Sequence, residues 1–193
     1  MKSPAIILAI AIGAPLLGHA DGAKPGNLPA NIQAPSGNKL YLVTHAEGAQ
    51  NYVCLPAKAD STFAWTLYGP QATLFAGKGN AEQIGTHFLS ADAAGAGHPS
   101  WQANDSSRVQ GTLVASSSDS AFVAPGAIPW LLLKASSTEA GKGGGARLAH
   151  VTFVQRIDTA GGVAPASGCQ SASDIGAKAL VPYTATYVFF EPK

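Results

Sequence analysis

Short runs rich in Val, Thr, Tyr, Phe and Trp recur along the chain, and clusters of Gly, Pro, Asn, Asp and Ser separate them. Within many runs apolar and polar residues alternate, which is the period of a strand with one buried face. No window of a dozen residues carries a sustained apolar stripe at helical spacing. About nine such short strands predict an all-β fold, either an antiparallel sandwich or a barrel.

Two of the runs give more detailed predictions. The stretch "KLYLVTHAEGAQNYVCLPA" (39–57) predicts a hairpin of two short strands that turn at "AEGA". Long irregular regions are expected at 89–107 and 136–146. The C-terminal run "YTATYVFF" is expected inside the sheet, and its alternation separates Tyr183, Ala185, Tyr187 and Phe189 on one face from Thr184, Thr186, Val188 and Phe190 on the other.

The first residues have the composition of a secretory signal. "MKSPAIILAIAIGAPLLGHA" combines one lysine, an apolar run and small residues before Asp21. The apolar run is shorter than the roughly 20 residues that cross a bilayer as a helix, so no membrane span is expected. The predicted organisation is a signal peptide at 1–20, an extended N-terminal leader at 21–38 and a single β domain at 39–193, in a secreted or periplasmic protein.

The cysteine content supports an oxidising compartment. The chain has two cysteines, Cys54 and Cys169, and both follow the predicted signal. In an exported protein such a pair predicts one disulfide, which would close a long loop. In the chain-entropy model such a loop closure contributes about 4–5 kcal/mol to stability.

The charge balance argues against nucleic acid as a partner. The chain carries 12 Lys and Arg residues against 11 Asp and Glu residues, and removal of Lys2 with the signal leaves equal numbers. Neither sign gathers into a block, so the basic surface that binds phosphates or anionic lipids is not indicated.

The stretch "GTHFLSADAAGAGHPSWQANDSS" (85–107) contains the best candidate site. His87 ends a strand-like run, Asp105 precedes the next, and Trp101 stands between them, so a hairpin-like return would bring the three together. An imidazole beside a carboxylate is a candidate acid/base or ligand-binding pair, and an indole can stack on a ligand. The alternative is structural: His87 hydrogen-bonds a turn carboxylate and Trp101 seals the core.

Motifs for cofactors and covalent catalysis are missing. Lys142 precedes "GGG" without the order of a phosphate-binding loop, and no G-x-S-x-G elbow occurs. No two histidines have the i, i+2 spacing that places metal ligands on one side of a strand. No cofactor is therefore predicted. A metal site stays open as an alternative if histidines from separate segments converge, and the candidates are His45, His87, His98 and His150.

Several segments in order resemble a family of secreted bacterial and fungal proteins classed only as a domain of unknown function. They include "LYLVTHAEGAQNYVC", "GTHF", "DSSRVQGTLVAS", "VTFVQRIDTAGGVAP" and "VPYTATYVFFEP", between Leu40 and Glu191. Some members of that family are labelled malate dehydrogenase. No G-x-G-x-x-G motif follows a strand in this chain, and nothing in its sequence supports that label.

The resemblance also ranks the candidate residues. The family pattern G-x-H-[YF]-x-G-P-x-W, with D-G-S shortly after, is matched at Gly85, His87, Phe88, Pro99, Trp101, Asp105 and Ser107. His98 and Ser106 stand where the pattern has glycine, and "LSADAAGAG" resembles an insertion. The resemblance therefore implies that His87, Trp101 and Asp105 belong to the family framework and that His98 is peculiar to this chain.

The sequence favours a binding module for a small ligand, a glycan or a protein partner. The alternative is an exported hydrolase that uses His87 with Asp105 or Glu47 as acid and base, or a metal-dependent enzyme that recruits His87 and His150. A purely structural or envelope-associated protein is the third alternative. Three polar side chains that converge in a pocket would favour an enzyme, whereas an exposed aromatic groove would favour binding.

Overall fold

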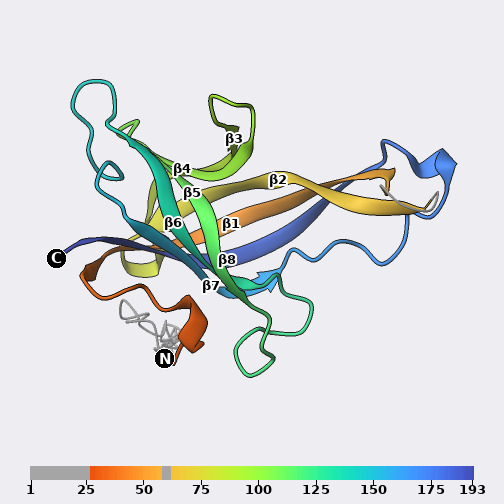
Figure 1. Cartoon of the computed structure of the whole chain (residues 1–193), viewed down its shortest axis with the longest axis horizontal. Helices are drawn as coiled ribbons and strands as arrows, with labels where there is room; N and C mark the ends of the chain where they lie inside the picture. The colour runs from red at the N-terminus through yellow and green to blue at the C-terminus, as the bar shows by residue number, and fades with distance from the viewer. Residues whose placement is uncertain (1–26, 58–61) are drawn as a thin grey trace, which may run out of the picture.

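A computed structural model describes residues 27–57 and 62–193 of the chain. The predicted signal peptide lies outside the described residues. Eight antiparallel strands follow one another around a closed barrel, so the predicted all-β fold is confirmed in its barrel form (Figure 1). The strands are β1 (Asn38–Pro56), β2 (Phe63–Ala76), β3 (Glu82–Ala91), β4 (Gly97–Ala103), β5 (Arg108–Ser117), β6 (Trp130–Glu139), β7 (Phe153–Gly161) and β8 (Lys178–Pro192).

The predicted hairpin at 39–57 is wrong, because β1 runs without a turn through "AEGA". This strand pairs with β2 along one edge and with β8 along the other. Gly48 stands at a close approach of β1 and β2, since a Cβ at this position would collide with the Gln71 carbonyl oxygen and lie 2.6 Å from the Ala72 Cβ. The glycine that resembles a turn signal therefore allows a close strand contact.

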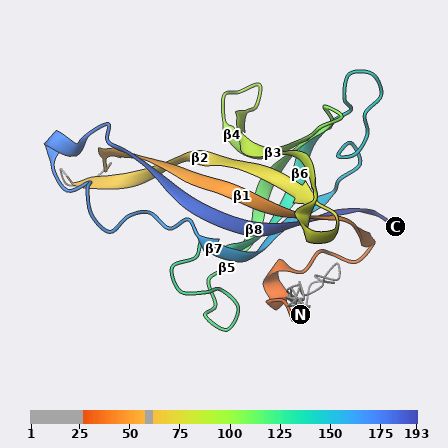
Figure 2. The same ribbon diagram turned by 180° about the vertical axis from the view of Figure 1, so that it is seen from behind.

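Three strands extend beyond the barrel as a twisted ribbon. β1, β2 and β8 project together to one side, and the view from behind shows the same arrangement (Figures 1 and 2). The predicted disulfide is confirmed and joins Cys54 of β1 to Cys169, which lies in the segment between β7 and β8. The Trp65 indole of β2 donates to the Ser167 carbonyl at 2.9 Å. The segment after β7 is thereby fastened to the ribbon.

The barrel interior is filled by side chains from all eight strands. Trp101 is 1% exposed and lies in this core with Leu74, Val109 and Val154. β8 follows the predicted alternation: Tyr183, Ala185, Tyr187 and Phe189 belong to the interior cluster. Val188 faces the opposite way, into a second cluster on the outside of the barrel, and Phe190 packs against that cluster.

The second cluster explains the conformation of the chain before β1. The short 3-10 helix η1 (Ala30–Ile32) places a fully buried Ile32 side chain against Trp130, Leu132 and Val188. The Gln155 amide donates to the Ile32 carbonyl at 2.6 Å. Residues 27–37, expected as part of an extended leader, thus cover an apolar outer face of the barrel.

Two regions expected to be irregular are more ordered than predicted. β4 occupies part of 89–107, and β6 extends to Glu139. Their Gly, Ser and Ala residues do not favour strands locally, so the sequence does not reveal these strands. Pairing with strands distant in the sequence orders them instead. Two further 3-10 turns, η2 (Lys78–Asn80) and η3 (Ala172–Asp174), complete the regular structure of the described residues. In that same part of the chain, no helix is long and apolar enough to cross a membrane.

Candidate functional site

His87 and Trp101 lie face to face inside the barrel. The two residues are direct partners across the β3–β4 pair, and their ring centroids are 4.6 Å apart with an interplanar angle of 11°. Tyr187 lies 4.9 Å from the imidazole, and the Phe189 ring contacts the indole edge-on. All four side chains are buried. The structure therefore brings together the first two predicted site residues, but as part of the core.

Burial sets the protonation state of His87. Desolvation is the main cause that lowers its pKa to about 3, and the nearby Arg156 charge acts in the same direction. A hydrogen bond to the Ser100 carbonyl partly opposes this shift, with Nδ1 as the donor at 2.8 Å. At neutral pH the imidazole is uncharged and a weak base, which suits packing better than proton transfer.

Asp105 occupies the turn between β4 and β5. Its Oδ1 accepts hydrogen bonds from the Ser107 backbone amide at 3.0 Å and from the Ser107 hydroxyl at 2.6 Å, and its Oδ2 accepts from the Arg147 amide at 2.9 Å. The Ser107 oxygen in turn accepts from the Leu148 amide at 2.9 Å. Asp105 therefore holds the β6–β7 connection against the β4–β5 turn.

The hydrogen bonds of Asp105 stabilise its charged form. Desolvation raises the pKa of this carboxyl, but the hydrogen bonds from Ser107 and Arg147 outweigh it and lower the pKa to about 2. Among the described residues no hydrogen bond or ion pair links Asp105 to His87. The two residues expected to form an acid/base pair are thus engaged in different structural contacts.

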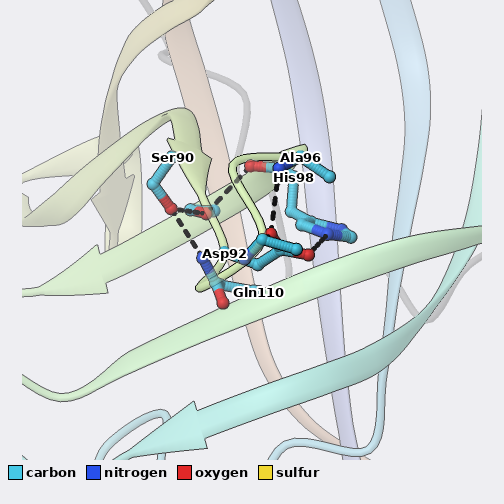
Figure 3. Close-up of polar contacts among 7 residues, drawn as sticks. Ser90, Asp92, Ala96, His98 and Gln110 are labelled. Carbon is cyan, nitrogen blue, oxygen red and sulfur yellow. Dashed lines mark hydrogen bonds and ion pairs between the residues drawn. The ribbon is translucent and has the colours of Figure 1, made fainter.

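The hairpin between β3 and β4 contains a second group of Ser, His and Asp side chains (Figure 3). The Gln110 amide donates to the Ser90 hydroxyl at 2.8 Å, and the hydroxyls of Ser90 and Ser100 are 2.6 Å apart. Ser100 donates to the His98 carbonyl at 3.0 Å, so Ser90 donates to Ser100. Both hydroxyl protons are used within this group, and neither serine hydroxyl is hydrogen-bonded to an imidazole.

The His98 imidazole belongs to a separate contact in that hairpin. Its Nε2 lies 2.9 Å from Asp92 Oδ2, while Asp92 Oδ1 accepts from the backbone amides of Ala94 and Ala96 (Figure 3). The hydrogen bonds from His98 and Ala96 lower the pKa of the half-buried Asp92 carboxyl. This arrangement stabilises the tip of the β3–β4 hairpin and does not form a nucleophile–base–acid relay.

The remaining histidines are dispersed. His45 lies on the outside of the barrel with its Nε2 3.4 Å from a Glu47 carboxylate oxygen, and His150 is exposed in the β6–β7 connection. Over residues 27–57 and 62–193, no group of three or more His, Cys, Asp or Glu side chains is placed to hold a metal ion.

A depression of about 520 Å³ crosses the outside of β1, β2 and β3. Its outward-facing residues form two rows across the strands, since Glu47 pairs with Thr73 and Ala49 pairs with Gln71. β3 completes the rows with Thr86 and Phe88. The inward-facing row between them also contributes to the lining and consists of Gly48, Ala72 and His87.

The lining of the depression combines small, polar and aromatic side chains. Small residues at positions 48, 49 and 72 leave space, while a carboxylate, an amide and two hydroxyls offer hydrogen-bonding groups. Phe88 adds a half-buried aromatic ring. The sequence prediction missed Gln71, Thr73, Thr86 and Phe88 because the strand register that aligns them is not visible in any single run; the outward polar positions in "EGAQ", "QAT" and "THF" are the local signal.

Comparison with known proteins agrees with the resemblance noted in the sequence. The family described as "Protein of unknown function (DUF3455)" matches residues 35–191, and the chain belongs to this family. No curated protein and no solved structure matches the chain significantly.

Proposed function

We propose that this member of the DUF3455 family is an exported binding module that takes a saccharide in the outer depression of β1, β2 and β3. The observation that carries the proposal is the pair of cross-strand rows, Glu47–Thr73–Thr86 and Ala49–Gln71–Phe88, around one hollow. Six positions from three strands thus present one continuous surface.

The chemistry of the rows suits a sugar. Saccharides combine many hydroxyl groups with a face of C–H bonds, so they need donors, acceptors and an aromatic surface. Glu47 accepts hydrogen bonds, Gln71 both donates and accepts, and the Phe88 ring can pack on the C–H face. The size of the depression lies within the range of small-molecule sites and fits one or two sugar rings.

The positions of the acid/base candidates favour binding over hydrolysis. The neutral His87 imidazole is stacked on Trp101, and the Asp105 carboxylate is occupied by the backbone of the β6–β7 connection. In this proposal His87 contributes to the floor of the depression, Trp101 supports it from inside the barrel, and Asp105 stabilises the scaffold. Cys54–Cys169 supports the exported location, since disulfides persist in oxidising compartments.

Isothermal titration calorimetry tests the proposal with a panel of soluble di- to hexasaccharides built from glucose, galactose, mannose and N-acetylglucosamine. At least one saccharide is expected to bind, and Phe88→Ala should weaken its binding roughly tenfold through loss of the stacking surface. Gln71→Ala should weaken the same interaction.

Tyr68→Ala is the matched control, because Tyr68 is an exposed aromatic residue of β2 outside the depression. It should leave binding unchanged. Failure of the whole panel, or equal losses for Tyr68→Ala and Phe88→Ala, would contradict the proposal. Release of shorter saccharides during the titration would favour the hydrolase instead.

A further inference from the structure

Arg156 is the only positively charged side chain whose contacts place it among the aromatic residues of the barrel interior, within the described part of the chain. It pairs across β7 and β8 with Tyr187, and Val154, two residues earlier on β7, belongs to the interior core. Its Nε and Nη2 donate to the Pro129 carbonyl at 3.1 and 2.9 Å. The guanidinium is thereby fixed between β7 and the segment that leads into β6.

This guanidinium lacks a carboxylate partner. Of the described acidic side chains, none lies within ion-pair distance of Arg156, whereas the exposed Lys39 and Arg147 each have a glutamate within 4.0 Å. A charge withdrawn from water is stabilised by hydrogen bonds and by opposite charge. The Pro129 carbonyl and the Tyr187 hydroxyl give Arg156 hydrogen bonds but no opposite charge. The half-buried position of Arg156 leaves it accessible from solvent.

Donor groups gather around the same end of the barrel. The Tyr183 and Tyr187 hydroxyls are 3.4 Å apart, and Tyr52 donates to the Gly162 carbonyl at 2.7 Å. Gly162 packs between Gln50 and Tyr183, since a Cβ at this glycine would lie 3.1 Å from the Gln50 Cγ and 3.0 Å from the Tyr183 Cβ.

Gln50 supplies the second, independent observation. Its side chain is 2% exposed, and its Nε2 has no hydrogen-bond partner among the described residues. A buried amide that donates to nothing costs about 1–3 kcal/mol. An anion at this end of the barrel would accept from this amide and neutralise the guanidinium at the same time.

The electrostatics agree with this geometry. Burial raises the pKa of the Tyr52, Tyr183 and Tyr187 hydroxyls, and the charge of Arg156 counteracts the rise at each of them. The same charge adds to the low pKa of His87, whose main cause is burial. The positive field of Arg156 therefore extends across the interior end that these side chains share.

We propose that this end of the barrel, between β1, β7 and β8, binds a small oxyanion, a carboxylate or an inorganic oxyanion, through the Arg156 guanidinium and the Gln50 amide. A planar guanidinium matches the two oxygens of such a group. One hydroxyl proton of the Tyr183–Tyr187 pair is a further donor, because only the other is used between the two hydroxyls. The site is distinct from the outer depression and does not depend on the saccharide proposal.

Thermal unfolding in sodium acetate and in sodium phosphate, each against sodium chloride at equal ionic strength, tests the site on the full exported chain. At an anion concentration about tenfold above the dissociation constant, the melting temperature is expected to rise by roughly 3 °C or more over chloride. The acetate and phosphate arms distinguish an organic from an inorganic source of the same chemistry.

Gln50→Glu is the most informative variant, because it places a carboxylate where the anion is proposed to bind. It is expected to melt higher than the wild type in chloride and to lose the response to acetate and phosphate. Arg147→Gln, at an exposed arginine outside the cluster, should keep the full response.

NMR of the wild-type protein tests the site even if a variant does not fold. The Arg156 side-chain Nε–H resonance of the wild-type protein should shift in a saturable manner with acetate or phosphate. Equal melting temperatures in all three salts together with an unmoved Arg156 resonance would overturn the proposal, and so would an unchanged anion response in a folded Gln50→Glu variant.

Discussion

Burial and stacking, rather than a neighbouring acid or base, determine the protonation state of the His87 imidazole. The ring lies between Trp101 and Tyr187, and its Nδ1 proton is donated to a backbone carbonyl. This accounts for a histidine that is both central to the barrel and unsuited to acid/base work at neutral pH. It also gives the fold a specific sensitivity to acid.

The first prediction concerns this acid sensitivity. The pKa of His87 is about 3 in the folded state and 6.5 ordinarily, so the unfolded state binds the proton first as the pH falls. The contribution of His87 to stability is complete above pH 6.5 and is lost as the pH falls toward 3, by up to about 1.4 kcal/mol per pH unit. Urea unfolding from pH 7 to pH 3.5 should show this slope, and His87→Gln should reduce it.

His45→Gln is the control for that series, because His45 is on the outside of the barrel. It should keep the wild-type pH dependence. Identical slopes for the wild type and His87→Gln would show that His87 does not titrate in this way.

The second prediction concerns Asp105. Asp105→Ala removes three hydrogen bonds to Ser107 and Arg147 and should lower the free energy of unfolding at pH 7 by about 1–2 kcal/mol, a modest value because the carboxylate is partly solvated. The folded-state pKa lies below the ordinary 3.8, so this stabilisation is present above pH 3.8 and is lost as the pH falls through about 2. Denaturant unfolding at pH 7 and pH 2 measures both effects.

Asp119→Ala provides the comparison, since the Asp119 carboxylate accepts a hydrogen bond from the amide of Ala121 within its own turn. Its loss should be smaller than that of Asp105→Ala. If the two variants were equally stable at pH 7, the role given to Asp105 would be wrong.

The sequence could identify His87 and Trp101 as neighbours, because a short hairpin returns the chain and cross-strand pairing follows. It could not show that both side chains face the barrel interior, because a shift of one residue in strand register exchanges the two faces of a strand. For the same reason the outer rows of the depression, which need the registers of β1, β2 and β3 together, were not predicted. Asp105 was expected beside His87, but its carboxylate binds the backbone of a connection about 40 residues later.

Strand β1 belongs to two parts of the structure, the barrel and the ribbon. Its first part closes the barrel against β8, and its last part forms the ribbon with β2 and carries Cys54. A shift in register with β2 at Asn51/Tyr52 lies near the transition between the two parts. Such bulges increase local twist, which reorients a long strand without breaking it.

The third prediction tests the close contact at Gly48. Gly48→Ala places a Cβ against the Gln71 carbonyl and the Ala72 side chain, and it should cost about 1–3 kcal/mol because two backbones must separate. Ala49→Ser, on the adjacent outward-facing position, should change stability by less than about 0.5 kcal/mol. Chemical denaturation of both variants checks this, and a fully stable Gly48→Ala would contradict the strand geometry.

The fourth prediction concerns the disulfide. The Cys54→Ser/Cys169→Ser double variant should lose about 2–5 kcal/mol of unfolding free energy, because the bond restricts a loop with a sequence separation of 115 residues. Reductant should lower the stability of the wild type and leave the double variant unchanged. Equal stability of the wild type and the double variant would show that the bond does not constrain the unfolded chain.

At the scale of the whole molecule, pairing between β1 and β8 closes the barrel and joins the two ends of the domain. This pairing extends from Asn38↔Pro192 to Val53↔Lys178 and is the longest in the structure. Strand composition and alternation predict an all-β fold because they report local burial. The closure of the barrel with its strands in chain order, and the number of strands, depend on pairing between residues far apart in the sequence. A single sequence does not reveal this pairing.

The fifth prediction follows from this closure. A chain that ends at Pro182 lacks most of β8, including Tyr187 and Phe189 of the core, and should not fold. Far-ultraviolet circular dichroism and one-dimensional NMR should show a disordered chain. A folded truncation with dispersed amide signals would mean that the barrel does not require its last strand.

Chemical-shift mapping of the ¹⁵N-labelled wild-type protein with the saccharide panel is the decisive test of saccharide binding in the outer depression, because it locates binding residue by residue. Saturable shifts are expected at residues 47–49, 71–73 and 86–88, with the amides of η1 and of the β3–β4 hairpin tip unmoved. Shifts confined to another face, or no shift with any saccharide of the panel, would contradict it.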